Sequence, residues 1–181
     1  RFCAGRRAGS PPSAGPVPIV GGLALDALGV GDPRARPGAE QGYAACVAAT
    51  PGPMALGRVG AGTGATLGTW GGADAGRPGG LGGAVQRQGE LIVAALLAVN
   101  ASGWVDTGDI DPRPGGGGLA TNTTIGVVVT NARLDKVGCH LLAQSAHDGL
   151  ARALVPAHTR FDGDAVVTAS VGPDEAKVDA Q

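Results

Sequence analysis

An α/β fold is predicted from three apolar segments and one long amphipathic segment. Residues 91–99 form a continuous apolar run between polar neighbours, which is typical of a strand buried on both faces. Residues 125–130 and 165–170 are two further apolar runs of strand length. Leucines and valines recur at helical spacing over residues 134–154, which predicts one amphipathic helix. Strands and a helix that lie this close in the chain indicate a mixed α/β domain.

The predicted helices have recognisable ends. A second helix is expected over residues 37–49, because Pro37 suits a first helical turn and alanine dominates the segment. Thr50 and the prolines after it stop this helix. For the helix over residues 134–154, Asn131 is the expected cap and Pro156 the expected end.

Length and composition limit the possible classes of protein. The 181 residues suit one domain or part of a larger one. Glycine and proline make up about a quarter of the chain. The net charge of −1 gives no reason to expect a nucleic acid or an anionic membrane as partner. No run reaches the roughly 18 apolar residues that cross a bilayer.

The cysteines argue for a reducing compartment. Cys3, Cys46 and Cys139 lie far apart and form no CxxC motif. Neither a disulfide framework nor a zinc site is expected from such spacing. We therefore expect a cytoplasmic protein.

No cofactor or metal is expected. The glycine-rich stretch 57–68 invites comparison with nucleotide-binding loops, but it has neither the GxGxxG spacing nor a GK[ST] ending. His140 and His147 lack the i, i+4 spacing and the acidic partner of a metal-binding helix. His158, beside a predicted turn, is expected to be solvated.

The stretch with the most chemical interest runs from residue 115 to residue 130. A run of four glycines, 115–118, leads to a Thr-Asn-Thr-Thr cluster at the start of the second predicted strand. If the Asn122–Thr123 bond is cut, Thr123 becomes an N-terminal residue that carries both a hydroxyl nucleophile and an amine that can serve as its base. The plainer interpretation is a glycine-rich hairpin with a polar strand start, and spacing alone favours it.

Three further polar residues are candidates for the same site. Asn100, Asp162 and Asp164 stand at the ends of predicted strands, where side chains from separate elements can converge. Taken singly, each has a structural interpretation. Asn100 suits a turn, and Asp162 and Asp164 suit a hairpin turn in which Gly163 adopts a positive φ.

A family resemblance joins these residues. The segment 122–132, with Leu134-Asp135-Lys136 after it, resembles the self-processing segment of the DmpA-type aminopeptidases. That family includes β-peptidyl aminopeptidases and the endo-type hydrolase of nylon oligomers. The other matching segments occur in family order: 29–33, 42–46, 60–66, 79–82, 98–101 and 159–164.

The resemblance implies a fold and a division of the chain. The implied fold is the αββα sandwich of N-terminal-nucleophile hydrolases, here lacking the family's N-terminal segment. Cleavage between Asn122 and Thr123 would leave a large subunit, 29–122, preceded by an irregular segment, 1–28. Residues 123–181 would form the small subunit, and the processed chains would form a homo-oligomer.

The resemblance also implies an activity and roles. The expected function is an amide hydrolase, aminopeptidase-like, that acts on short peptides or small amides. Thr123 would match the nucleophile and Asn100 the residue that helps to hold the oxyanion. Asp162 and Asp164 would match the pair that orients the amine and hydroxyl of the nucleophile.

The alternative is a truncated homologue that has lost activity and serves as a structural or interaction subunit. Two departures from the family pattern motivate it. One is the missing N-terminal segment, and the other is Thr69, which stands where the family usually has a catalytic lysine. This alternative predicts an exposed apolar sheet face.

Overall fold

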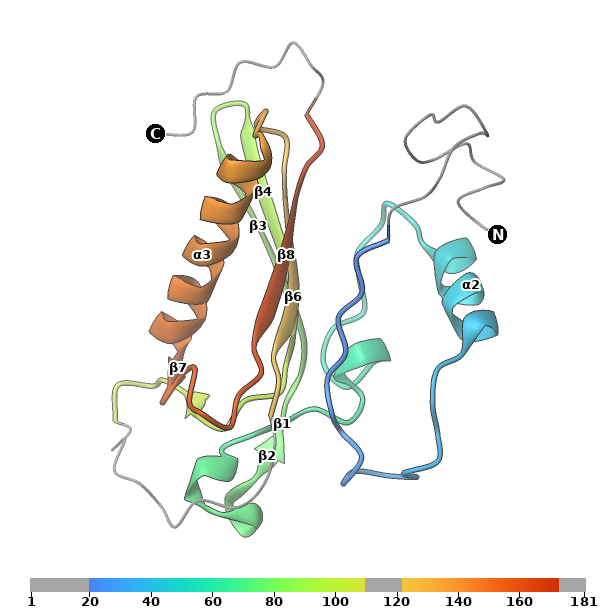
Figure 1. Cartoon of the computed structure of the whole chain (residues 1–181), viewed down its shortest axis with the longest axis vertical. Coiled ribbons are helices and arrows are strands. Elements are labelled where there is room, and N and C mark those ends of the chain that lie inside the picture. The colour runs from blue at the N-terminus through green and yellow to red at the C-terminus, as the bar shows by residue number, and fades with distance from the viewer. Residues whose placement is uncertain (1–19, 110–121, 173–181) are drawn as a thin grey trace. The chain divides into compact units, whose positions relative to one another are not determined.

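The computed structural model describes residues 20–109 and 122–172, which separate into two units (Figure 1). The first unit comprises residues 20–22 and 31–54, and the second comprises the rest of the described residues. Residues 1–19 of the expected irregular segment, and the glycine run 115–118, lie outside the described residues. Between residues 20 and 38 the chain forms no helix or strand.

The first unit contains one helix, α2 (Ala39–Ala48). It lies within the predicted range 37–49 and begins after Gly38. The Gln41 side chain turns back and accepts a hydrogen bond from the Gly38 N–H at 2.9 Å, which satisfies one of the free donors at the helix start.

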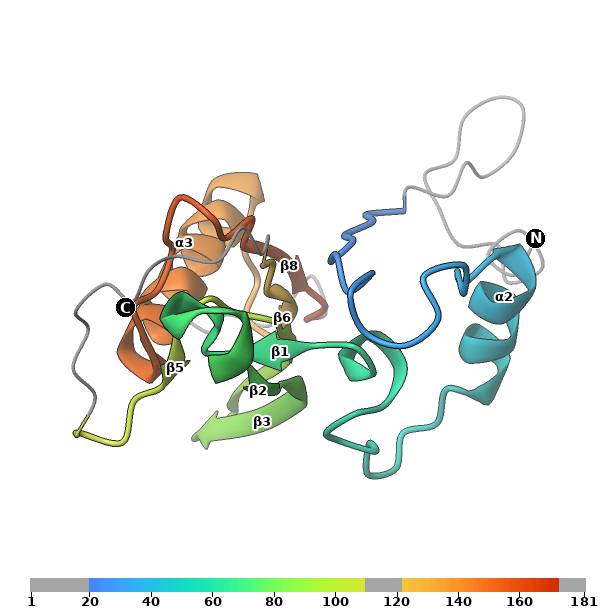
Figure 2. The ribbon, with the colours of Figure 1, turned by 90° about the horizontal axis from the view of Figure 1, so that it is seen from below.

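The second unit is built on a four-stranded sheet. Its order is β3 (Gly80–Gln88), β4 (Leu91–Val99), β6 (Ile125–Thr130) and β8 (Ala165–Ser170). Neighbours are antiparallel except β6 and β8, which are parallel. The long helix α3 (Lys136–Ala153) connects these two parallel strands and covers one face of the sheet (Figures 1 and 2). The three predicted strands are therefore confirmed with the same bounds, and so is the α/β class.

The predicted cap of α3 is wrong. Asp135 caps the helix, since its carboxylate accepts a hydrogen bond from the Gly138 N–H at 2.7 Å. Asn131 instead ties β6 to the start of β4: its side chain accepts from the Ile92 N–H and donates to the Glu90 carbonyl, both at 2.8 Å.

The helix α3 also ends earlier than Pro156. At Leu154 the chain enters a short strand, β7 (Leu154–Val155), which pairs with β5 (Trp104–Val105).

The strand β3 was not predicted. Its first residues belong to the glycine-rich stretch 73–83, which the sequence suggests is a turn region. Glycine is needed here because another backbone approaches closely. A Cβ atom on Gly80 would lie 2.8 Å from backbone atoms of Gly57, and one on Gly79 would lie 2.3 Å from the Val99 carbonyl oxygen.

Short elements precede β3 and bring Thr69 toward the sheet. They are the 3₁₀ turns η1 (Gly60–Gly62), η2 (Thr69–Gly71) and η3 (Ala73–Ala75), and the strand pair β1 (Thr66–Leu67) and β2 (Arg77–Pro78).

The two faces of the sheet differ in their cover. On one face Leu97 and Val166 pack against a cluster that includes Leu150 of α3 and Leu154 of β7. The opposite face is also apolar, because the alternate residues of the paired strands are Ile125, Val127 and Val129 of β6 and Ala165, Val167 and Ala169 of β8.

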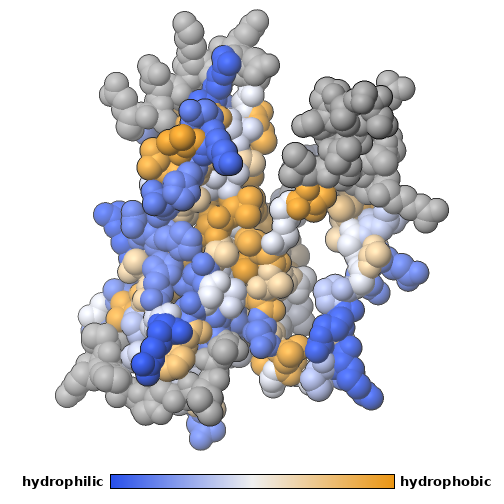
Figure 3. All heavy atoms as spheres, in the orientation of Figure 1, coloured by the Kyte–Doolittle hydropathy of each residue, from blue (hydrophilic) through white to orange (hydrophobic). Residues whose placement is uncertain are grey.

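Burial of this second face is incomplete. Figure 3 shows apolar residues along β6 and β8, and Val167 is 39% exposed. The prediction that residues 91–99 are buried on both faces is wrong for this structure, because only Ala98 of β4 is buried. Among the described residues, no helix is long and apolar enough to cross a membrane.

Candidate active site

The Asn122–Thr123 junction lies immediately before β6. Asn122 is 2% exposed, and its carbonyl oxygen accepts two hydrogen bonds. One comes from the Gly163 N–H at 2.8 Å and the other from Thr123 Oγ1 at 2.7 Å. The carbonyl of the peptide bond at which cleavage is predicted is therefore polarised by a backbone donor and lies beside the predicted nucleophile.

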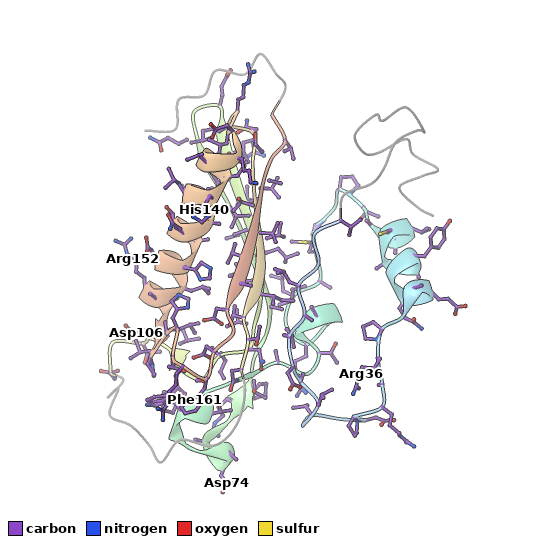
Figure 4. The ribbon with its side chains drawn as sticks, in the orientation of Figure 1. Arg36, Asp74, Asp106, His140, Arg152 and Phe161 are labelled. Carbon is purple, nitrogen blue, oxygen red and sulfur yellow. The ribbon has the colours of Figure 1, made fainter. Side chains whose placement is uncertain are left out.

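The parallel pairing of β6 and β8 explains this placement. Asn122 continues that pairing as a bridge to Asp162, and its N–H donates to the Phe161 carbonyl at 2.9 Å. Phe161 belongs to the loop between β7 and β8, at the end of the sheet where β6 and β8 begin (Figure 4).

Gly163 is small because Thr123 is close. A Cβ atom on Gly163 would lie 3.0 Å from Thr123 Oγ1. The predicted reason for this glycine is wrong, since its φ is not positive.

The Asn122 side chain is held by Thr69. Thr69 Oγ1 donates to Asn122 Oδ1 at 2.7 Å, and both side chains are buried. From the sequence, Thr69 is expected only to remove the charge of the family lysine. The structure instead gives this residue a neutral, direct contact with the junction. The signal that pointed to it was its match to the position of the family lysine.

Asp164 joins the residue after the nucleophile to a histidine. Its Oδ1 accepts from the Thr124 N–H at 2.8 Å, and its Oδ2 lies 2.7 Å from His158 Nδ1. The other ring nitrogen, Nε2, lies 3.0 Å from the His147 carbonyl oxygen. His158 is exposed, as expected, but both of its ring nitrogens have protein partners.

The contacts of His158 favour its charged form. Partial burial lowers the pKa of this imidazole, but the His147 carbonyl and the Asp164 carboxylate raise it, with a smaller contribution from Asp162, and the net pKa is raised. Both ring nitrogens face acceptors, and only the imidazolium can donate to both.

Asp162 organises the loops around the junction. Its Oδ1 accepts from the Ser102 N–H at 2.9 Å. Its Oδ2 accepts from the N–H and the hydroxyl of Thr159, at 3.0 and 2.5 Å. The structure therefore brings Asp162 beside Asn122, with its carboxylate already satisfied by three donors.

The Asn100 side chain also makes structural hydrogen bonds. Its side-chain oxygen accepts from the N–H and hydroxyl of Thr66 at 2.9 and 3.2 Å, and its amide donates to the Asp26 carbonyl at 3.1 Å. Its backbone N–H donates to Thr124 Oγ1 at 3.2 Å. Asn100 thus reaches the residue beside Thr123 through its backbone.

The other candidates do not join the site. His140 is exposed on α3 (Figure 4). Within residues 20–109 and 122–172, no group of three His, Cys, Asp or Glu side chains is arranged to hold a metal ion.

Solved structures identify the class of fold. An L-aminopeptidase D-Ala-esterase/amidase from Ochrobactrum anthropi, described as a variant of the Ntn hydrolase fold, matches with a TM-score of 0.50 and 22% identity over 73% of this chain and 38% of that chain. A β-aminopeptidase from Burkholderia sp. matches with a TM-score of 0.53 and 24% identity over 77% of this chain and 42% of that chain. The predicted N-terminal-nucleophile type of fold is confirmed.

Sequence comparison gives the family. Residues 13–180 match Peptidase family S58, and the chain belongs to this family. An uncharacterized aminopeptidase of Mycobacterium leprae is 39% identical over 92% of this chain and 53% of its own length. The 6-aminohexanoate-oligomer endohydrolase of Paenarthrobacter ureafaciens is 31% identical over 68% of this chain and 41% of its own length. The chain thus spans about half the length of these curated relatives, and the resemblance inferred from the motifs is confirmed.

Proposed function

We propose that this protein is an amide hydrolase that cuts itself between Asn122 and Thr123 and then uses Thr123 as its nucleophile. One observation carries the proposal. The Asn122 carbonyl oxygen contacts Thr123 Oγ1 at 2.7 Å and the Gly163 N–H at 2.8 Å, so that the nucleophile and an oxyanion donor meet at one peptide bond.

Self-cleavage begins when Thr123 Oγ1 attacks the Asn122 carbonyl carbon and loses its proton. The Gly163 N–H stabilises the negative charge on the carbonyl oxygen. The C–N bond between Asn122 and Thr123 then breaks, and the nitrogen takes up a proton to become the amine of Thr123. Water hydrolyses the resulting ester, which leaves a carboxylate on Asn122 and returns the proton to Oγ1.

The same groups then act on a substrate. The Thr123 amine accepts the Oγ1 proton, because an α-amine has a reference pKa near 8 and is partly neutral at pH 7. Oγ1 attacks the substrate's amide carbon, the leaving amine takes the proton, and water releases the acyl group. The names of the relatives support short peptides or small amides as substrates.

The surrounding polar residues position these groups. Asp164 holds the Thr124 N–H, and Asn100 holds Thr124 Oγ1, so that both fix the backbone next to Thr123. Asp162 fixes the loops that carry Ser102 and Thr159. In this arrangement Gly163 is the oxyanion donor with the best support.

Mass spectrometry after denaturing electrophoresis tests the proposal. The wild type should yield a fragment that begins at Thr123. The variant Thr123→Ser, which keeps a hydroxyl, should still cut, whereas Thr123→Val should stay intact. Thr107→Val, at an exposed site, is the matched control and should cut normally. A wild type that remains one uncut chain would overturn the proposal and favour the structural-subunit alternative.

A further inference from the structure

We infer that His158 is a positioning residue for Thr123. The Nδ1 atom of its ring fixes the Asp164 carboxylate, and this carboxylate fixes the backbone next to the nucleophile. The inference deepens the proposed function and rests on it, because it requires Thr123 to attack the Asn122 carbonyl. It gives a part in self-cleavage to an exposed residue whose ring contacts Asp164 and the backbone of α3.

The two oxygens of Asp164 have separate partners. Oδ1 accepts from the Thr124 N–H at 2.8 Å, and Oδ2 lies 2.7 Å from His158 Nδ1. The Thr124 N–H lies in one peptide plane with the Thr123 Cα, so that holding this N–H fixes the plane from which the Thr123 side chain projects. Because the Asp164 side chain is only 5% exposed, water is a poor substitute for the ring nitrogen. The contact with His158 therefore limits rotation of the carboxylate away from the Thr124 N–H.

The ring of His158 is itself anchored on helix α3. Its Nε2 lies 3.0 Å from the His147 carbonyl oxygen, and the two imidazole rings meet edge-on with 5.0 Å between their centroids. The backbone of His158 has a φ of 50°, in the left-handed region that residues with a side chain seldom adopt. Such a conformation persists where the surrounding contacts determine it. The ring thus connects the nucleophile's neighbour to the helix that packs on the sheet.

A purely structural role for the same ring makes a different prediction. If His158 only ties its loop to α3, the contact that matters runs from Nε2 to the His147 carbonyl. If it positions Thr123, the contact that matters runs from Nδ1 to Asp164. The two nitrogens can be replaced separately, because the amide nitrogen of asparagine lies near the position of Nδ1 and that of glutamine near the position of Nε2. Glycine removes both nitrogens and suits the φ of 50°.

The test follows the appearance of the fragment that begins at Thr123 after cell-free synthesis of the chain. We expect His158→Gly to cut roughly 10-fold more slowly than the wild type, because even a shift below 1 Å misplaces the nucleophile. His158→Asn, which still donates to Asp164, should stay within about 3-fold of the wild type, since only the charge of the donor is lost. His158→Gln should be as slow as His158→Gly. His140→Asn, at an exposed site on α3, is the matched control and should cut at the wild-type rate.

The rates are compared below the Tm of every variant, so that loss of the fold is not taken for loss of positioning. Cleavage at the wild-type rate by His158→Gly overturns the inference, and so does a rate for His158→Gln that equals or exceeds that of His158→Asn. A His158→Gly chain without a folding transition also overturns it, because the ring would then be required for the fold itself.

A second measurement asks whether His158 acts through the carboxylate. In the Asp164→Asn background, His158→Gly should change the rate by less than about 3-fold, because the group through which the ring acts is gone. An equal loss in both backgrounds overturns the inference, and the order of the single variants decides alone if Asp164→Asn does not cut. If the wild type cuts itself but the variants do not follow this order, the inference alone fails. If the wild type is never cut, the proposed function fails as well.

Discussion

Replacing Gly163 by alanine tests the geometry of the junction most directly. The added Cβ would lie 3.0 Å from Thr123 Oγ1, which is closer than about nine in ten real contacts of a Cβ atom. The hydroxyl must then move by a few tenths of an ångström. Because Oγ1 is only 2.7 Å from the Asn122 carbonyl oxygen, the movement disturbs its approach to the carbonyl carbon. A displacement of 1 Å costs about 100-fold in rate, so that a smaller shift predicts a loss of roughly 10-fold.

The fold should tolerate the same change. Gly163 has no positive φ, and alanine at such a position changes the free energy of unfolding by about 1 kcal/mol or less. The assay is the rate at which the fragment beginning at Thr123 appears, followed by denaturing electrophoresis, together with the Tm of each variant. Gly82→Ala is the matched control, since no atom lies within 4 Å of its added Cβ. Normal cleavage by Gly163→Ala with an unchanged Tm would refute the close approach of Thr123.

Three further changes probe the surroundings of the nucleophile. Asp164→Ala removes the carboxylate that accepts from the Thr124 N–H and contacts His158. It should lower the free energy of unfolding by about 1–3 kcal/mol and slow self-cleavage. An unaltered urea midpoint would contradict this expectation. Because the pKa of His158 is raised in the fold, its contribution to stability is fully present below its ordinary pKa of about 6.5 and is lost as the pH rises through the raised value. The unfolding free energies of wild type and His158→Gln should therefore converge as the pH rises, and a constant difference would argue against the ion pair. Asp135→Ala removes the α3 cap and should cost about 1 kcal/mol by the same measurement, with exposed Asp148→Ala as a control that changes little.

The hydrophobic pattern of the sequence correctly predicted those elements that are defined by their own apolar side chains. The strands β4, β6 and β8 have the predicted bounds because each is a compact apolar run. The strand β3 was missed because its glycines are explained by the backbone of Gly57 and Val99, which lie far from it in sequence. Asn131 and Asp135 are both good capping residues, so the sequence alone does not show which of them caps α3. The structure distinguishes them, because the Asn131 side chain is bonded to β4 and Asp135 is bonded to the start of the helix.

The residues of the site that belong to a sequence motif were predicted. The residues that reach the site only through contacts between distant segments were missed. Thr123 and Asn122 stand together by sequence, and the parallel pairing of β6 with β8 brings Asp164 to them. Thr69 was not expected to contribute to the site, because it lacks the charge of the lysine that the family usually has there. Its hydrogen bond to Asn122 depends on a turn that no local pattern places. His158 was missed for a similar reason, since its partners come from α3 and from the start of β8.

At this site the groups that meet at the scissile bond differ from the polar side chains that hold the backbone in place. The atoms that meet at the junction are one hydroxyl, on Thr123, and one backbone donor, on Gly163. The conspicuous polar side chains are occupied in holding backbone groups: Asp164 the Thr124 N–H and Asp162 the Ser102 N–H. Because a misplaced backbone moves the nucleophile, substitution of either carboxylate should change the geometry of attack as well as the local charge. The severity of such substitutions is therefore no measure of direct contact with a substrate, and the small change Gly163→Ala separates the two effects more cleanly.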